Sequence, residues 1–321
     1  RTHMEFIAQC SFNNLGLNSG FGDEKFLNIP WGWRVVGDLG WFLRDSRATW
    51  WWRHYLPNRC GLDVYQPGMV VDDSLPLEEP AEWTGMSVFP IYKQALGYER
   101  ASKEIVTTPP EPAGKEWFNK IVFREAWDPE AQYLLFDGSI ESAQKADSAY
   151  PPGPSGHNQN DSNTIINYTD EGRMWLVDHT YSNRAITEHS GLSIARDGVF
   201  SYERHKAKLR EAAQGAGLAL ARSVFEDYSG ADWERTIFWR QGDYFLVLDR
   251  VVAQAPGHFV ARCSYRALGE EQLRGPALRL EQKGKHFAIV SDGAAELYVE
   301  RFAFPVADAW KGYSFAKPVV K

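Results

Sequence analysis

Apolar and polar positions alternate with the period of a β-strand through most of the chain after residue 118. Several of these segments flank short glycine-containing turns, at 170–172, 241–242 and 283–285, which is the pattern of β-hairpins. The strands follow one another without a helix between each pair, so we expect an antiparallel arrangement. The chain is therefore predicted to be mainly β, with a large antiparallel β-sandwich of two stacked sheets. The predicted strands cover residues 119–127, 132–137, 163–169, 173–177, 191–195, 235–240, 244–252, 258–265, 286–291 and 296–302.

The first 60 residues have a pattern that is helical in part. Apolar positions recur at roughly helical spacing over residues 33–52. Asp45 is a candidate cap for a second short helix over residues 50–55, which Pro57 is expected to end. His54 in this helix is expected to be a packed residue and not a ligand. A short α-helical segment should therefore precede the sandwich.

Residues 66–90 contain four prolines and an acidic cluster, which predicts a connector without regular structure. We therefore divide the chain into an α-helical remnant with a proline-rich connector, residues 1–90, and a β-sandwich domain, residues 91–321. Residues 202–220 are polar and rich in alanine, and their pattern fits either a helix or a long strand.

Composition narrows the classes of function. A chain of 321 residues that is 44% hydrophobic can bury a large core as one big or two ordinary domains. The net charge of −7 argues against general binding to nucleic acid or to a membrane surface, and no apolar run is long enough to span a membrane. The three cysteines are spaced neither as a disulfide framework nor as a zinc motif. The 13 Trp, 14 Tyr and 18 Phe residues suit either sugar stacking or a sandwich core, and we favour the core.

Side chains that can carry protons or bind metals gather at both ends of the hairpin predicted around residues 170–172. Because its two strands run antiparallel, residues 161 and 178 should lie at the same end of the hairpin. This stretch is therefore the candidate site. Its members are His157, Gln159 and Asp161 before the hairpin, and Asp178, His179 and His189 after it.

The order of motifs in this stretch resembles a known family. The sequence HNQND at 157–161 is followed by a strand, a turn with glycine, LVD at 176–178, a loop with tyrosine and a further histidine at 189. This order resembles the C-terminal β domain of heparinase II/III-like polysaccharide lyases, where the histidine motif has the form H-x-H-x-D. The flanking strand patterns extend the likeness over residues 90–260. The helical lead-in is similar to the tail of that family's helical toroid.

The resemblance implies β-elimination at a uronic acid residue of an acidic polysaccharide, such as a glycosaminoglycan or alginate. A base removes the C5 proton, a neighbouring group neutralises the carboxylate, and an acid releases the C4 oxygen. The resemblance also implies that His157 is a catalytic residue and that Gln159, Asp178 and His189 form a metal site, which in the family usually holds zinc. Gln159 stands where the family has a histidine, and glutamine is a poor zinc ligand. Zinc, a harder divalent ion such as calcium, and no ion therefore all stay open.

Further residues near this motif have supporting or binding roles in the same interpretation. Asp161 and Asn163 are expected to buttress the motif through hydrogen bonds to the backbone. Tyr181 and Arg184 are candidate substrate contacts, since arginine can bind a uronate carboxylate through two hydrogen bonds. A tucked-in loop tyrosine and a surface arginine fit these two positions equally well. His179 is a weaker candidate ligand, because neighbouring residues on a strand point to opposite faces.

Part of the family's active site has no match here. Its catalytic tyrosine and carboxylate-neutralising residue lie upstream of a loop that resembles residues 20–23. We therefore expect a fragment of a longer lyase, with low activity on its own. Two alternatives remain: a non-catalytic module that binds an acidic glycan, and a uronyl C5-epimerase, which begins with the same proton removal. A homodimer is also open, and the resemblance implies a periplasmic or secreted protein.

Overall fold

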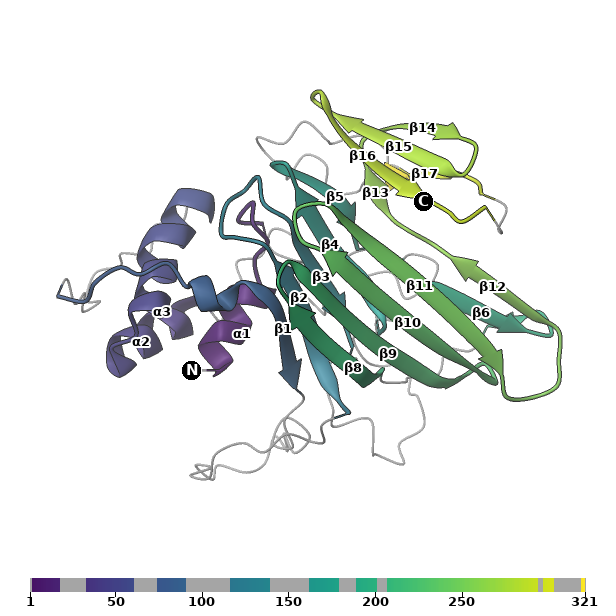
Figure 1. Ribbon diagram of the computed structural model, residues 1–321, viewed down its shortest axis with the longest axis horizontal. Helices are drawn as coiled ribbons and strands as arrows, with labels where there is room; N and C mark the ends of the chain where they lie inside the picture. Colours follow the sequence, from purple (N-terminus) through teal and green to yellow (C-terminus); the bar gives the residue numbers. More distant parts are fainter. Residues whose placement is uncertain are drawn as a thin grey trace.

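The computed structural model of the chain describes residues 2–17, 33–60, 74–90, 116–138, 162–178, 189–200, 207–293, 297–302 and 319–320. Within these ranges the fold is mainly β, with stacked antiparallel sheets and a group of short helices at one side (Figure 1). The predicted fold class, a β-sandwich preceded by a helical segment, is confirmed.

The first sheet has eight strands in the order β1-β2-β3-β4-β5-β13-β18-β17, and every neighbouring pair is antiparallel. The hairpin between β4 and β5 turns at Glu171 and Gly172, whose φ values of 52° and 69° fit the tight turn predicted there. The strands are β1 (Gly85–Pro90), β2 (Phe118–Arg124), β3 (Tyr133–Asp137), β4 (Thr164–Asp170), β5 (Arg173–Val177), β13 (Ala267–Leu268), β17 (Arg301–Phe302) and β18 (Val319–Val320).

The second sheet has four long strands in the order β11-β10-β9-β8. They are β8 (Lys208–Gly215), β9 (Leu218–Tyr228), β10 (Ala231–Arg240) and β11 (Tyr244–Ala253). Two three-stranded sheets accompany it, in the orders β12-β6-β7 and β14-β15-β16. Their strands are β6 (Leu192–Arg196), β7 (Val199–Phe200), β12 (Phe259–Cys263), β14 (Glu270–Arg274), β15 (Ala277–Gln282) and β16 (Lys285–Val290).

Aromatic side chains fill the space between the first and second sheets. Burial alternates along β10, as expected for a strand with one face on a core. Trp239 from this strand meets Phe123 of β2 edge to face, with ring centroids 5.8 Å apart, and stacks on Phe245 of β11 at 5.6 Å. Much of the aromatic content therefore serves as core packing.

The helices precede the sheets in the sequence and lie against one side of the first sheet (Figure 1). Asp45 caps α3, because its carboxylate accepts hydrogen bonds from the backbone N–H groups of Arg47 and Ala48. Pro57 does not end the following helix, contrary to the prediction, since the chain continues past it in the wider π-helical form. The helices are α1 (Thr2–Cys10), α2 (Trp33–Leu43), α3 (Ser46–Trp50), the π-helix η1 (Trp51–Cys60) and the 3₁₀ turn η2 (Ala81–Trp83).

One arginine fastens the end of α1 to the first sheet. The buried Arg124 guanidinium at the end of β2 donates to the backbone carbonyls of Gln9, at 3.2 Å, and Phe12, at 3.0 Å. Its carbon lies 4.0 Å from the ring centre of Trp127 and 4.4 Å from that of Tyr133. A charged group is thus held between two aromatic faces and the carbonyls that end a helix.

The structure corrects two predictions about local structure and decides between the two alternatives left open in a third. The proline-rich connector is wrong over its last residues, because β1 forms there; β1 is an edge strand, where a terminal proline removes no needed donor. The strand alternative holds for residues 208–215, and the position of β8 at a sheet edge explains its polar composition. Residues 297–300 are not in a strand, so the last predicted strand is wrong over that part.

Candidate functional site

Asp178 and His189 are brought together at one end of the first sheet. Asp178 directly follows β5, and its backbone N–H donates to the carbonyl of Ile166 at 2.9 Å. Ser190 forms a bridge with Ile165, which places His189 beside the same part of β4. His189 Nδ1 lies 2.7 Å from Asp178 Oδ1, and both side chains are buried. The β4–β5 hairpin therefore positions the pair where β4 begins.

The geometry of this pair is that of a carboxylate–imidazole hydrogen bond. Two ligand atoms of a tetrahedral zinc ion lie about 3.4 Å apart, given the usual bond lengths near 2.1 Å. At 2.7 Å the pair shares a proton and does not point two lone pairs at one ion. This hydrogen bond fixes the tautomer and the ring orientation of His189. The second ring nitrogen, Nε2, points away from Asp178. Within the described ranges no three His, Cys, Asp or Glu side chains are close enough to hold a metal.

Asn163 joins the HNQND segment to β4 in a left-handed conformation, with φ of 65°. Its backbone N–H donates to the carbonyl of Asp137 at 2.7 Å. Its side-chain Oδ1 accepts from the hydroxyl of Ser223 on β9 at 2.5 Å. The Asn163 side chain is therefore hydrogen-bonded to a side chain of the second sheet, whereas we predicted a hydrogen bond to the backbone. This hydrogen bond fixes the position of Asn163 directly before β4.

A buried arginine from the second sheet connects the two segments of the candidate site, the one before β4 and the one that carries His189. Arg235 on β10 donates to the carbonyls of Asn163 and Ser190, each at 3.1 Å, and to both oxygens of Asp249 at 2.8 Å. Trp233 Nε1 also donates to Asp249, at 2.7 Å. The side chain is fully buried, and every one of these bonds crosses between strands or sheets. Arg235 thus sets the spacing between the segment before β4 and the segment that carries His189.

The charges of this buried pair shift each other's pKa. Burial raises the pKa of Asp249, but the charge and hydrogen bonds of Arg235 outweigh it and leave the pKa below its ordinary value. Burial lowers the pKa of Arg235, and the nearby Asp249 carboxylate more than reverses this. Both groups are therefore ionised at neutral pH. Sequence analysis missed this pair, although a charged residue at an inward position of β10 is a signal for it.

A second buried ion pair lies at the same sheet end. Lys120 Nζ on β2 lies 2.8 Å from Asp137 Oδ1 on β3, and the two residues face each other in the strand register. Asp137 also holds the backbone of Asn163, as described above. Sequence analysis also missed this pair, because a lysine and an aspartate near the ends of strands have the pattern of ordinary surface residues.

Six of the predicted site residues lie outside the described ranges. The catalytic candidate and the other members of the HNQND segment precede residue 162, and the loop residues fall between 178 and 189. His54 was predicted to be packed, and this is wrong, because it is exposed beside Trp50. The predicted residues outside the described ranges are His157, Gln159, Asp161, His179, Tyr181 and Arg184.

The fold is that of known polysaccharide lyases. Heparinase III superposes with a TM-score of 0.61 and 13% identity, covering 94% of this chain and 43% of that chain. A heparan sulfate lyase from Pedobacter heparinus superposes with a TM-score of 0.56 and 15% identity, covering 91% of this chain and 39% of that chain. The chain shares the fold of the part of heparinase III that it matches. It spans about two fifths of the length of these lyases.

No protein-family model matches the chain, and no curated protein matches it in sequence. At 13–15% identity the likeness to heparinase III and the heparan sulfate lyase shows a common fold and not a common reaction. Within the described ranges, every helix is too short or too polar to cross a membrane.

Proposed function

We propose that this chain is part of a polysaccharide lyase that acts on an acidic polysaccharide by β-elimination at a uronic acid residue. The carrying observation is the fold shared with heparinase III and the heparan sulfate lyase over nearly the whole chain. The buried Asp178–His189 pair supports it, since it lies at the sheet end where the HNQND segment enters β4.

In this proposal His157 exchanges a proton with the substrate. Removal of the C5 proton leaves an electron pair that forms the C4–C5 double bond, the C4–O bond breaks, and the leaving oxygen takes up a proton. Tyr181 and Arg184 bind the sugar, the arginine through the uronate carboxylate. Asp161 and Asn163 hold the motif in place. The group that neutralises the uronate carboxylate is not assigned to any residue of this chain.

We test the reaction on the longest natural protein that contains this chain. Heparan sulfate, hyaluronan, chondroitin sulfate and alginate are offered in turn, and the ultraviolet absorbance of an unsaturated uronate product is followed. We expect absorbance to rise with at least one of them and to vanish in His157→Ala. His258→Ala is the matched control, because that side chain is exposed and belongs to the residue just before β12, outside the predicted site residues.

The alternatives give different results in the same assay. Exchange of the C5 proton with solvent deuterium without new absorbance would replace the lyase by an epimerase. Saturable glycan binding with neither change would leave a binding module. Full turnover by a His157→Ala variant with native thermal unfolding would remove His157 from the mechanism.

We further propose that Gln159, Asp178 and His189 form a divalent metal site, with zinc as the first ion to test. An ion there would fix the fold of the two segments that carry the predicted site residues. To bind it, Asp178 and His189 must give up the hydrogen bond that joins them. We expect protein purified with zinc to retain the metal after dialysis, and His189→Ala to lose it, as measured by elemental analysis. Wild-type protein that retains no metal would overturn this assignment.

The proposed substrate is an extracellular polymer, so we expect the protein in the periplasm or outside the cell. Fractionation of the native host followed by immunoblotting tests this. Recovery in the cytoplasmic fraction would contradict it.

A further inference from the structure

The outer face of the second sheet carries a patch of apolar side chains. Ile237 and Trp239 of β10 point into the core, so Phe238 between them points outward. In the strand register Phe238 lies between Leu220 of β9 and Leu246 of β11. Apolar side chains from three neighbouring strands therefore form one continuous outer patch. Its members are Leu218, Leu220, Phe238, Tyr244, Leu246 and Leu248.

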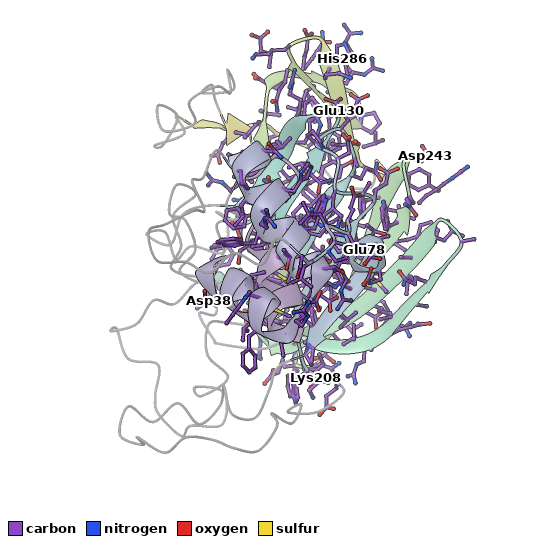
Figure 2. All side chains as sticks on the ribbon, turned by 90° about the vertical axis from the view of Figure 1, so that its left-hand side faces the viewer. Asp38, Glu78, Glu130, Lys208, Asp243 and His286 are labelled. Atoms are coloured by element: carbon purple, nitrogen blue, oxygen red, sulfur yellow. The ribbon has the colours of Figure 1, made fainter. Side chains whose placement is uncertain are left out.

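The large side chains of the outer patch are open to solvent. Leu218, Tyr244 and Leu246 are each 46% exposed, and Leu248 is 54% exposed. Figure 1 shows β8–β11 broadside, and Figure 2, turned by 90°, shows the same strands at one edge of the molecule near Asp243. A contiguous apolar patch on the surface of a protein marks an interaction site more often than scattered apolar residues do.

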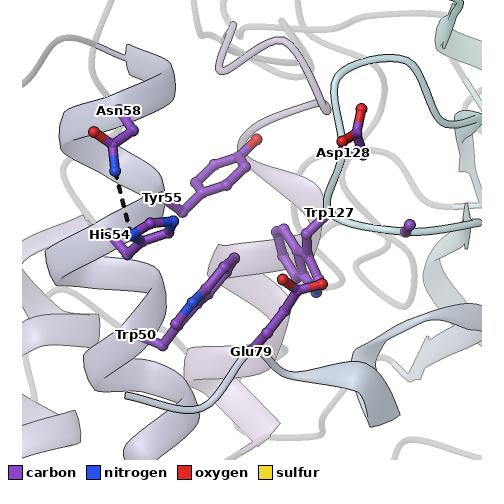
Figure 3. A pocket seen from close by; sticks show the side chains of 8 residues that line it. Trp50, His54, Tyr55, Asn58, Glu79, Trp127 and Asp128 are labelled. Atoms are coloured by element: carbon purple, nitrogen blue, oxygen red, sulfur yellow. Dashed lines mark hydrogen bonds between the residues drawn. The ribbon is translucent and has the colours of Figure 1, made fainter.

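The pocket between the helices and the first sheet offers no such surface. Its volume is about 490 Å³, and it is lined in part by the rings of Tyr55 and Trp127 (Figure 3). These two residues are only 1% and 2% exposed, because their rings pack on each other with centroids 5.2 Å apart and Arg124 lies on the Trp127 ring. The protein itself covers these rings, whereas the side chains of the outer patch are uncovered.

Charged side chains border the outer patch in pairs of opposite sign. The pairs are Glu211 with Arg222, 3.0 Å apart, Arg240 with Asp243, 3.3 Å apart, and Glu234 with Arg250, which face each other in the strand register. The whole chain, in contrast, has a net charge of −7. A strongly acidic or basic partner would require a border of one sign. This face therefore suits a partner surface that is apolar and bordered by mixed charges, as it is itself.

The size of the face matches what a stable dimer needs. The strands β8, β9, β10 and β11 contain 8, 11, 10 and 10 residues. With about 4.8 Å between strands and about 3.3 Å per residue, the face measures roughly 19 Å by 33 Å, so two such faces cover roughly 1,200 Å² together. Stable and specific interfaces bury about 1,200–2,000 Å² in total. The face is therefore large enough to hold two copies together.

We propose that the outer face of the second sheet binds the same face of a second copy of this chain, so that the protein is a two-fold symmetric dimer. A dimer of this symmetry uses one patch twice, and the outer patch supplies apolar surface to both sides. Two sheets that pack face to face lie about 10 Å apart, which lets the outward side chains of the two copies interdigitate. The mixed charges at the border allow the copies to approach without net repulsion there. This proposal concerns assembly and does not rest on the proposed reaction.

The test is sedimentation velocity of the chain over a wide range of concentration. We expect the sedimenting mass to rise from the 36.5 kDa of one chain toward twice that value. Leu246→Lys combined with Leu248→Lys should weaken association by about tenfold or more, because each change places an ammonium group in an apolar interface. Far-ultraviolet circular dichroism and thermal unfolding check that this variant is folded, and Tyr244→Lys replaces it if it is not.

Val260→Lys combined with Val290→Lys is the matched control. These two valines are 47% and 67% exposed and belong to β12 and β16, outside the second sheet. We expect the control to associate as the wild type does. An equal loss in the control would overturn the proposal, because added charge anywhere would then be enough to weaken association.

Four further results would overturn the proposal. A single-chain mass at every concentration would exclude the dimer, and full association of the folded patch variant would assign the dimer to another face. If the chain dimerises but the longest natural protein that contains it does not, another part of that protein covers the face. Cosedimentation of monomeric wild type with phosphatidylcholine vesicles, lost in the patch variant, would assign the face to a lipid surface. None of these measurements follows turnover, so each leaves the lyase proposal to its own assay.

Discussion

Removal of the Arg235 guanidinium should be among the most damaging single changes in the chain. In Arg235→Met the carbonyls of Asn163 and Ser190 lose their charged donor, and Asp249 loses two hydrogen bonds at 2.8 Å. Only 16% of the Asp249 side chain is exposed, and Trp233 Nε1 is left as its strong donor. Breaking a buried ion pair by removing one partner costs about 3–5 kcal/mol of the free energy of unfolding.

Denaturant unfolding, followed by far-ultraviolet circular dichroism, measures this loss. The double variant Arg235→Met/Asp249→Leu should recover a large part of it, because no charge is then left buried without its partner. Arg222→Met is the matched control on the neighbouring strand, since Arg222 and Glu211 form an exposed pair whose loss costs under about 1 kcal/mol. A loss below about 1 kcal/mol in Arg235→Met would refute the reasoning.

The same pair predicts a dependence on pH. The pKa of Asp249 is lower in the folded chain than in the unfolded chain, so its contribution is fully present above about pH 4 and declines as pH falls through the folded value. The stability difference between wild type and Arg235→Met should therefore narrow as pH falls below about 4. A constant difference down to acid unfolding would contradict the assigned charge state.

Two further changes test the packing and the buried carboxyls. Gly37→Ala places a Cβ 2.5 Å from Nε1 of the buried Trp52, so thermal unfolding should show a loss of about 1–3 kcal/mol, whereas Gly215→Ala, with open space around it, should stay within about 0.5 kcal/mol. Burial raises the pKa of Asp170, although the hydroxyl of Tyr168 donates to it, so this carboxyl costs stability as pH rises above about 4. Asp170→Asn should therefore gain stability relative to wild type between pH 3 and pH 7 in denaturant titrations, and a relative loss over that interval would contradict the raised pKa.

The parts of the fold that sequence predicted are those fixed by local chemistry. Residues 170–172 place Gly172 at a position of positive φ between two short, largely apolar strands that are buried almost throughout, so the β4–β5 hairpin follows from a dozen residues. The meeting of Asp178 with the start of β4 follows from that hairpin. The proximity of His189 to Asp178 needed the family resemblance, since ten residues of sequence separate the two.

The parts that sequence did not predict depend on partners far along the chain. The role of Arg235 requires a carboxylate 14 residues away and carbonyls more than 40 residues away, which no local pattern reveals. The strand β1 was hidden by its terminal Pro90 and by the prolines of the preceding segment, because a proline is tolerated in this strand only through its place at a sheet edge. The exposure of His54 depended on which elements cover the helix. Trp50, Trp51 and Trp52 are all buried, so neighbours lie on several sides and leave His54 facing outward.

The hydrogen bonds from Arg124 to the end of α1 restrict how the helices can move relative to the sandwich. A hinge that swings α1 away from the first sheet would have to pull the Gln9 and Phe12 carbonyls off a buried guanidinium. Hydrogen bonds to a charged group contribute about 1.5–3 kcal/mol each, so such an opened state would be rarely populated. Any opening and closing of this part of the molecule must therefore take place in segments other than α1, which moves with the first sheet as one rigid body.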